Sequence, residues 1–162
     1  MKVLLALWVG LVALVAAGQS PLQRRVVREV VEYFNGRSTG NFVFKEQTVE
    51  GAVERGDSSG TFVQLKVHLV QTTCRKRAAQ RHNCRALDSR RKPTCLACFK
   101  FDTGDVPKVL DKYHNCGPSH HLLVKEIRQR DEAECRAVEE AGKALDSLYL
   151  PGMFAFSKGL PA

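Results

Sequence analysis

The chain of 162 residues has none of the short motifs that usually mark an enzyme. It contains no nucleophile elbow, no glycine-rich phosphate loop and no recognisable pair of catalytic carboxylates. Its five histidines show neither a metal-ligand spacing nor a nearby carboxylate in a catalytic arrangement. We therefore expect a protein without catalytic activity, without a metal or cofactor, and without a nucleic acid partner.

Long apolar runs are equally scarce, and the single one lies at the N-terminus. Met1-Lys2 is followed by apolar residues from Val3 to Ala17, and small residues come next. This order is typical of a secretory signal peptide, and the run is shorter than the roughly 20 residues of a membrane span. We assign residues 1–18 to the signal and expect a soluble, secreted mature chain.

Cysteine is absent from the first third of the chain, which must therefore fold by packing alone. Six cysteines follow, and an even number in an oxidising compartment predicts three disulfides, with fifteen connectivities open. The spacing Cys95-Leu-Ala-Cys98 lies in a strand-like stretch, where side chains three apart point to opposite faces. We interpret it as structural, not as a redox motif or a zinc site. The six are Cys74, Cys84, Cys95, Cys98, Cys116 and Cys135.

The positive charge is unevenly distributed. The formal net charge is +8, and most of it lies in the segment 75–92, where Asp88 is the only acidic residue. Such a run is usually a solvated loop, but this one can also attract a sulfated glycan such as heparan sulfate, or an anionic membrane. Few apolar residues interrupt it, so we do not expect deep membrane insertion. Its basic residues are Arg75, Lys76, Arg77, Arg81, Arg85, Arg90, Arg91 and Lys92.

The first expected element is an amphipathic helix. Ser20 can cap it, Pro21 suits its first position, and Gln23 completes a capping box. Apolar residues recur at helical spacing up to Phe34, and Asn35-Gly36 ends the helix. Because its valines favour a helix only weakly, we expect it to pack against another element.

That other element is predicted to be an antiparallel sheet. The clearest strand is Thr61–Thr72, where apolar and polar residues alternate, and an earlier strand begins at Phe42. The stretch Gly56–Gly60 is expected to turn between them. We place a third strand at Thr94–Asp102 and a fourth at Leu122–Ile127. One helix on one face of a four-stranded antiparallel sheet is an α+β fold.

The C-terminal segment 149–162 is apolar and aromatic, although core segments rarely lie at a free end, because termini fray. Pro151-Gly152 favours a turn and Pro161 cannot extend a ladder, so neither a helix nor a central strand suits it. We interpret it as a masked peptide ligand; the alternative is an edge strand tucked onto the sheet. The expected ligand residues are Tyr149, Leu150, Pro151, Gly152, Met153, Phe154, Ala155, Phe156 and Ser157, and cleavage is expected at Ser157 and Lys158.

The capped helix, the hairpin ending in Gln71-Thr-Thr-Cys74 and the later cysteines resemble the cystatin/cathelicidin superfamily. Within it, Cys74-Arg-Lys-Arg77, Cys95-Leu-Ala-Cys98 and the ending Tyr149–Lys158 resemble the chemerin family, and the likeness extends over nearly the whole chain. It implies a cystatin-like fold with a flexible C-terminal tail. It also implies the disulfides Cys74–Cys84, Cys95–Cys116 and Cys98–Cys135.

The resemblance further implies a function. Chemerin-family proteins are secreted precursors, chemoattractants and adipokines, that act on a G-protein-coupled receptor, chemokine-like receptor 1, once their C-terminus is trimmed. Carried over to this sequence, residues 19–147 form the cystatin-like domain, 148–157 the receptor-activating peptide and 158–162 an inhibitory extension. A serine protease cutting after Lys158, followed by a carboxypeptidase, would leave Ser157 at the end. We expect the chain to be a monomer.

Two other functions of the superfamily stay open. Gln47-Thr-Val-Glu-Gly51 matches the Gln-x-Val-x-Gly wedge of cystatin-type cysteine-protease inhibitors, but it precedes the expected hairpin tip. The Pro-Trp second loop of those inhibitors is missing, since the single tryptophan, Trp8, belongs to the signal. We interpret the match as coincidental. A cathelicidin-like antimicrobial role of the basic segment is the other alternative, and it can coexist with signalling.

Overall fold

The first helix begins and ends where short-range hydrogen bonds favour it. In the computed structural model, which describes residues 18–77, 83–88 and 92–143, helix α1 spans Pro21–Arg37. The Ser20 hydroxyl accepts from the Gln23 backbone N–H at 3.1 Å, and the Gln23 side chain accepts from the Ser20 N–H at 3.4 Å. The predicted helix and its capping box are therefore confirmed, and the helix ends one residue later than Gly36.

Four strands follow α1 and pair in chain order as one antiparallel sheet. They are β1 Phe42–Asp57, β2 Gly60–Arg75, β3 Pro93–Phe101 and β4 Val109–Pro118. The first three lie where the sequence predicted strands, and β1 and β2 are joined by a tight turn at Ser58-Ser59. The predicted fold class, one N-terminal helix on a four-stranded antiparallel sheet with three disulfides, is confirmed.

The predicted fourth strand at Leu122–Ile127 is wrong. That segment forms the 3-10 turn η1, His121–Leu123, and the start of a second helix, α2, which spans Lys125–Glu139. A short apolar run such as this one is compatible with a strand and also with one turn of a helix. Periodicity alone therefore does not distinguish the two structures. The true fourth strand, β4, is polar and mostly half-exposed because it lies at the sheet edge, so it lacks the alternation that reveals a strand.

Helix α2 was not predicted, because two of its inward positions are not aliphatic. Its buried residues are Asp131, Cys135 and Val138, which have helical spacing but little hydrophobicity. Asp131 accepts hydrogen bonds from the Tyr113 hydroxyl at 2.7 Å and from the Asn115 side-chain amide at 3.1 Å. A hydrogen-bonded carboxylate and a disulfide thus occupy positions that are usually apolar in an amphipathic helix.

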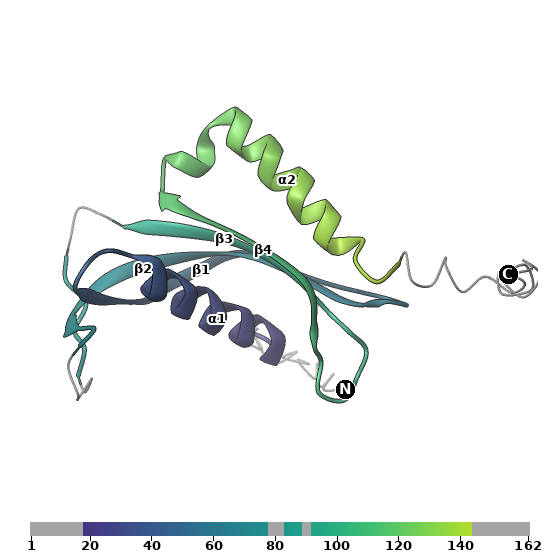
Figure 1. Ribbon diagram of the computed structural model, residues 1–162, viewed down its shortest axis with the longest axis horizontal. Helices are drawn as coiled ribbons and strands as arrows, with labels where there is room; N and C mark the ends of the chain where they lie inside the picture. The colour runs from purple at the N-terminus through teal and green to yellow at the C-terminus, as the bar shows by residue number, and fades with distance from the viewer. Residues whose placement is uncertain (1–17, 78–82, 89–91, 144–162) are drawn as a thin grey trace, which may run out of the picture.

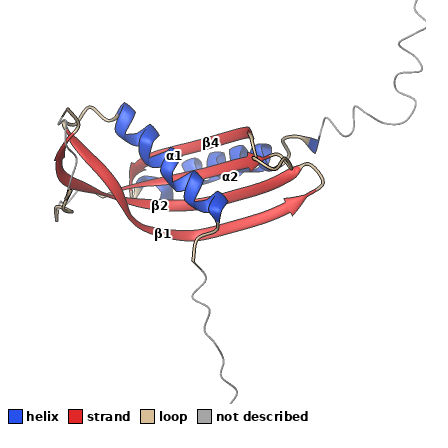
Figure 2. Ribbon diagram, turned by 90° about the horizontal axis from the view of Figure 1, so that it is seen from below, coloured by secondary structure: helices blue, strands red, loops and turns tan. Residues whose placement is uncertain are grey.

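The two helices cover opposite faces of the sheet, so the domain has three layers (Figures 1 and 2). On the α1 face, valines of α1 pack against one set of alternating residues of β2 and β3. On the α2 face, the other set meets η1 and α2. The first cluster comprises Val26, Val27, Val30, Val63, Leu65, Val67, Leu69, Cys95, Ala97, Phe99 and Phe101; the second comprises Phe62, Leu96, Cys98, Leu122, Cys135 and Val138.

Each of the three disulfides fixes a different part of the fold. Cys95–Cys116 joins β3 to β4 on the α1 side, and Cys98–Cys135 joins β3 to α2 on the other side. Cys74–Cys84 holds the chain that follows β2 against the end of that strand. These are the pairs that the chemerin resemblance implies. Cys95 and Cys98 do lie on opposite faces, as the period of a strand requires.

Removing the disulfide that holds α2 should cost more stability than removing the one at the end of β2. The two bonds separate cysteines by 37 and 10 residues, and the larger loop restricts the unfolded chain more. We expect the double variant Cys98→Ser with Cys135→Ser to lower the free energy of unfolding by about 3–4 kcal/mol. For Cys74→Ser with Cys84→Ser the loss should be smaller, by about 1 kcal/mol. Urea unfolding followed by circular dichroism checks this, and a reversed order would contradict it.

Candidate functional site

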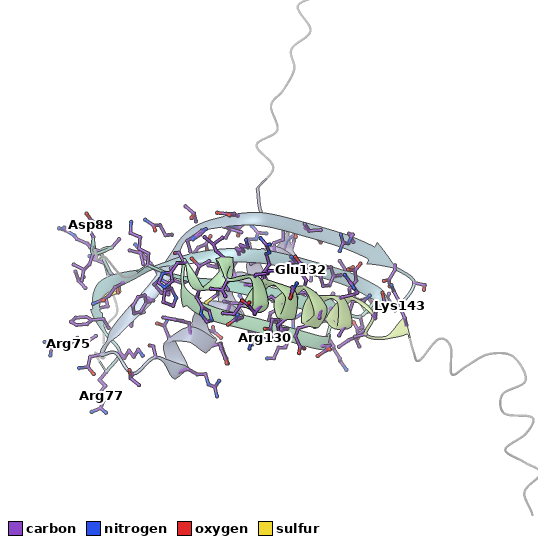
Figure 3. The ribbon with its side chains drawn as sticks, turned by 90° about the horizontal axis from the view of Figure 1, so that it is seen from above. Arg75, Arg77, Asp88, Arg130, Glu132 and Lys143 are labelled. Atoms are coloured by element: carbon purple, nitrogen blue, oxygen red, sulfur yellow. A yellow bond between two sulfur atoms is a disulfide. The ribbon has the colours of Figure 1, made fainter. Side chains whose placement is uncertain are left out.

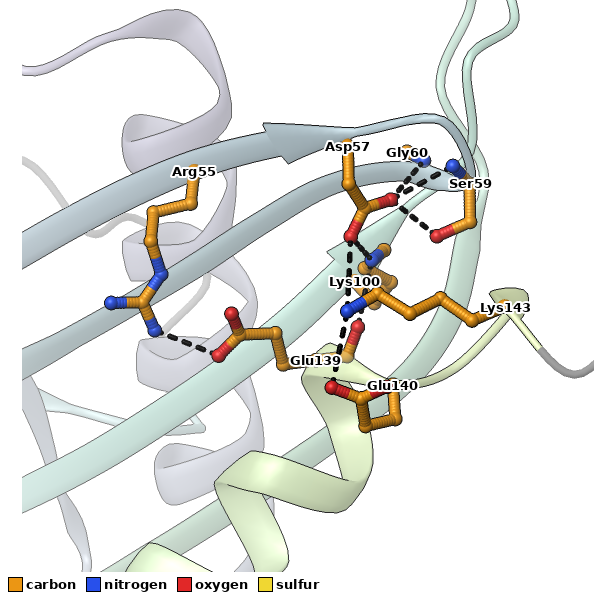
Figure 4. A network of polar contacts seen from close by, with 8 residues as sticks. All are labelled: Arg55, Asp57, Ser59, Gly60, Lys100, Glu139, Glu140 and Lys143. Atoms are coloured by element: carbon orange, nitrogen blue, oxygen red, sulfur yellow. Dashed lines mark hydrogen bonds and ion pairs between the residues drawn. The ribbon is translucent and has the colours of Figure 1, made fainter.

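The residues predicted to bind a receptor, 149–157, and the cleavage residues Ser157 and Lys158 lie outside the described residues. The described part of the chain ends at Lys143, just after α2. Around that place lies a polar cluster, which we call the exit cluster and which Figure 4 shows. Its members are Arg55, Asp57, Ser59, Lys100, Glu139, Glu140 and Lys143.

Lys100 lies at the centre of the exit cluster. It belongs to β3, is fully buried, and points to the α2 side of the sheet because its strand neighbours Phe99 and Phe101 take the α1 side. Its ammonium donates to Asp57 Oδ2 at 2.8 Å and to the backbone carbonyl of Glu139 at 2.7 Å. The second bond satisfies a carbonyl at the end of α2, where a cation also interacts favourably with the helix dipole.

Asp57 links this lysine to the β1–β2 turn. Its Oδ1 accepts from the Ser59 N–H at 2.8 Å, from the Ser59 hydroxyl and from the Gly60 N–H at 3.2 Å. Gly60 has φ 148°, and a Cβ there would lie 1.8 Å from the Phe101 carbonyl oxygen, so only glycine fits. The turn is thereby pressed against β3, and one carboxylate holds the hairpin tip and the end of α2 together.

Charge pairs complete the exit cluster. Arg55 Nη2 lies 2.7 Å from Glu139 Oε2, while its guanidinium also covers the Phe62 ring at 5.4 Å. Lys143 Nζ lies 3.1 Å from Glu140 Oε1 and 3.7 Å from Asp57 Oδ2. Lys143 is therefore held beside the hairpin tip.

The electrostatics of the cluster follow from these contacts. The Lys100 ammonium, and next the Ser59 hydroxyl, hold the pKa of Asp57 well below its usual range, because both stabilise the carboxylate. The hydrogen bond to Glu140 raises the pKa of Lys143. The charged side chains of the exit cluster are paired with one another, which favours a structural, positioning role over acid–base chemistry.

Sequence reasoning did not find Lys100 or Asp57 as members of a site. The available signal was a single lysine inside the apolar run from Cys95 to Phe101, since a buried ammonium requires a partner. That partner lies 43 residues earlier in the chain, and no local pattern identifies it. The predicted basic segment is described only in part: Arg75, Lys76, Arg77, Arg85 and Lys92 are described, whereas Arg81, Arg90 and Arg91 lie outside the described residues.

The inhibitor-like match, Gln47–Gly51, lies in the middle of β1 and not at the hairpin tip. Val49 packs partly against the α1-side core, and Gly51 takes φ 62° beside a register shift between Glu50 and Val53. The segment is a bulged part of an edge strand. A wedge that enters a protease cleft needs an exposed turn, which this segment does not form.

Two classes of site are not found in the part of the chain that the structure describes. No group of three or more histidine, cysteine, aspartate or glutamate side chains is placed to hold a metal ion there. No helix within the described ranges is long and apolar enough to cross a membrane.

The lowered pKa of Asp57 predicts an acid dependence of stability. A carboxyl whose pKa is depressed on folding stabilises the fold above its unfolded pKa, about 3.9, and that contribution is lost as the pH falls further. Asp57→Asn should therefore flatten the fall in stability below about pH 4. Urea unfolding between pH 2 and 7 measures this, with the exposed Asp105→Asn as the matched control. An identical slope in the Asp57 variant would contradict the assignment.

The solved structures that match the chain include two small proteins. The crystal structure of Al-CPI is 19% identical, with a TM-score of 0.47, and the match covers 61% of this chain and 92% of that one. The crystal structure of dimeric human cystatin F is 22% identical, with a TM-score of 0.43, covering 63% and 84%. No protein-family model matches the chain.

Comparison with curated proteins finds relatives along almost the whole chain. Human retinoic acid receptor responder protein 2 is 38% identical over 157 residues, which cover 97% of this chain and 94% of the human protein. The bovine protein of the same name is 35% identical over 156 residues, with coverages of 96% and 94%. At this identity and coverage, the chain belongs to the family of retinoic acid receptor responder protein 2, the chemerin family.

Proposed function

We propose that this chain is a secreted, non-catalytic precursor of a chemoattractant that activates chemokine-like receptor 1 after its C-terminus is trimmed. The observation that carries the proposal is full-length membership of the chemerin family. The three disulfides, which persist in oxidising compartments, agree with an extracellular protein. The exit cluster gives the domain a further physical role, because it fixes Lys143, the last described residue before that C-terminus.

The activating segment has enough apolar surface to supply much of the binding energy. Burying one large apolar side chain contributes roughly 1.5–3 kcal/mol. Five anchors therefore supply on the order of 7–15 kcal/mol before ordering costs, against about 12 kcal/mol for nanomolar affinity. The anchors are Tyr149, Leu150, Met153, Phe154 and Phe156.

Trimming would act at the end of that segment. Removal of residues 158–162 leaves a new carboxylate on Ser157, and a charge-assisted hydrogen bond to it contributes roughly 1.5–3 kcal/mol, or about ten- to a hundredfold in affinity. A larger activation would require that residues 158–162 also clash with the receptor pocket. Lys158 is in this scheme the recognition residue for a serine protease, and a carboxypeptidase then removes it.

The position of Gln47–Gly51 within β1 argues against cysteine-protease inhibition as the main function. The wedge of such an inhibitor must enter the protease cleft, whereas the exposed tip of this hairpin is the polar turn at Ser58-Ser59. Papain inhibition is accordingly the assay that would revive this alternative.

The first test compares the chain ending at Ala162 with the chain ending at Ser157. On cells that express chemokine-like receptor 1, we expect the shorter chain to be at least about tenfold more potent in calcium release, because only it presents the Ser157 carboxylate. Cells without the receptor are the control. If both chains are silent on receptor-bearing cells, the scaffold and not the C-terminal segment is functional.

The second test removes one anchor. In the chain ending at Ser157, Phe156→Ala should lower potency by about tenfold or more, because it deletes a large apolar contact. The melting temperature should stay unchanged if the segment is a ligand and not part of the core. A marked loss of thermal stability would instead support the tucked-strand alternative.

A further inference from the structure

The described basic residues and the exit cluster lie at opposite ends of the molecule. Figure 3 shows Arg75, Arg77 and Asp88 at one end and Lys143 at the other. Strand β2 runs the whole way between them, since Gly60 pairs with Asp57 in the exit cluster and Arg75 pairs with Phe42 at the far end. Sixteen residues of strand span about 50 Å, many times the Debye length of about 8 Å at physiological salt.

At the far end, two segments distant in sequence enclose a hollow. The α1–β1 loop contributes one wall, and the residues that follow β2 contribute the other. The hollow has a volume of about 540 Å³, within the range of ligand sites. It is lined by Asn35, Gly36, Ser38, Thr39, Gly40, Asn41, Arg75, Lys76 and Arg77.

Hydrogen bonds join the two walls of the hollow. Lys76 Nζ donates to the Ser38 carbonyl at 2.7 Å and to the Ser38 hydroxyl at 2.5 Å, and the Lys76 N–H donates to the Asn41 carbonyl at 2.8 Å. Lys76 thus tethers the two walls. Its neighbours Arg75 and Arg77 are exposed, and neither has a carboxylate partner within the described residues.

A third arginine extends this surface. The Thr73 N–H donates to the Arg85 carbonyl at 2.9 Å, and the Arg85 N–H donates to the Thr73 hydroxyl at 3.3 Å. Arg85 therefore lies beside Thr73, close to Arg75 in β2. The disulfide Cys74–Cys84 fixes this pairing. Arg75 and Arg85 are therefore presented by paired backbone, and Arg77 follows the tethered Lys76, so that three exposed arginines lie next to a polar hollow.

This chemistry suits a sulfated glycan better than a membrane. Guanidinium groups bind planar or tetrahedral oxyanions through paired hydrogen bonds, and a hollow lined by serine, threonine and asparagine can accept a polar chain. Basic residues alone attract an anionic membrane, but stable membrane binding is favoured where apolar side chains also insert. Of the large apolar residues exposed in the described ranges, only Leu87 lies in the basic segment.

We propose that the hollow between Ser38–Asn41 and Arg75–Arg77 is a binding site for the sulfate groups of a glycan, and that Arg85 extends it. Because this site and Lys143 lie at opposite ends of the described domain, we expect glycan binding not to block the receptor activity carried by the C-terminal segment. This second part rests on the proposed receptor function, whereas glycan binding itself does not.

The test measures binding of the chain ending at Ser157 to immobilised heparin, with Arg75→Gln and Arg77→Gln made together. We expect heparin affinity to fall by about tenfold or more, since two charge-assisted contacts are lost. The matched control is Arg128→Gln with Arg136→Gln, which removes the same charge from exposed positions on α2 and should change affinity far less. Thermal unfolding of both variants verifies that they fold.

Three outcomes would overturn the glycan site: equal affinity of the Arg75/Arg77 variant, an equal loss in the Arg128/Arg136 control, or equal binding to desulfated heparin. Preferential binding to phosphatidylserine vesicles would assign the surface to membranes instead.

A second arm presents heparin-bound chain, on beads, to cells expressing chemokine-like receptor 1. Signalling from the beads is expected at a potency close to that of free chain. If the bead-bound chain is silent and free chain is active, glycan binding blocks receptor activation, and this part of the proposal is wrong. If free chain is silent as well, the proposed receptor function is wrong.

Discussion

The alternation of side chains along β3 is the constraint on which the rest of the structure depends. Cys95 and Ala97 face α1, whereas Leu96, Cys98 and Lys100 face α2. Each of the two cysteines is bonded on its own side of the sheet. A shift of β3 by one residue would exchange the two faces, separate both disulfides from their partners and move Lys100 into the apolar α1 side. The register of this one strand therefore determines where both helices lie.

The same strand connects the core to the C-terminal segment. Lys100 is buried, yet its ammonium holds a surface hairpin through Asp57 and the end of α2 through the Glu139 carbonyl. A buried ion pair is weak evidence for net stability, because desolvation offsets much of the attraction. Its effect here is geometric, since it leaves one arrangement in which the ammonium is satisfied. The exit cluster therefore fixes how the end of α2 and Lys143 lie against the hairpin tip.

The length of strands β1 and β2 separates the exit cluster from the hollow. The long strands β1 and β2 place the exit cluster at one end and the tethered hollow at the other. Charges at the two ends are separated by several Debye lengths and do not influence each other appreciably. The proposed glycan site and Lys143 thus lie at opposite ends of one domain. The Cys74–Cys84 disulfide contributes by holding the chain after β2 against the strand end, so that the Arg85 backbone is paired with Thr73.

The sequence by itself determined the elements whose causes are local. The capping residues Ser20 and Gln23 fixed the start of α1, the alternation in β2 marked a strand, and six cysteines required disulfides. Only the tertiary structure decided the rest. It replaced the expected strand at Leu122–Ile127 by α2, paired Lys100 with Asp57, and brought Ser38 to Lys76. These features depend on contacts between residues far apart in the chain, where a polar residue becomes acceptable only because its partner is already in place.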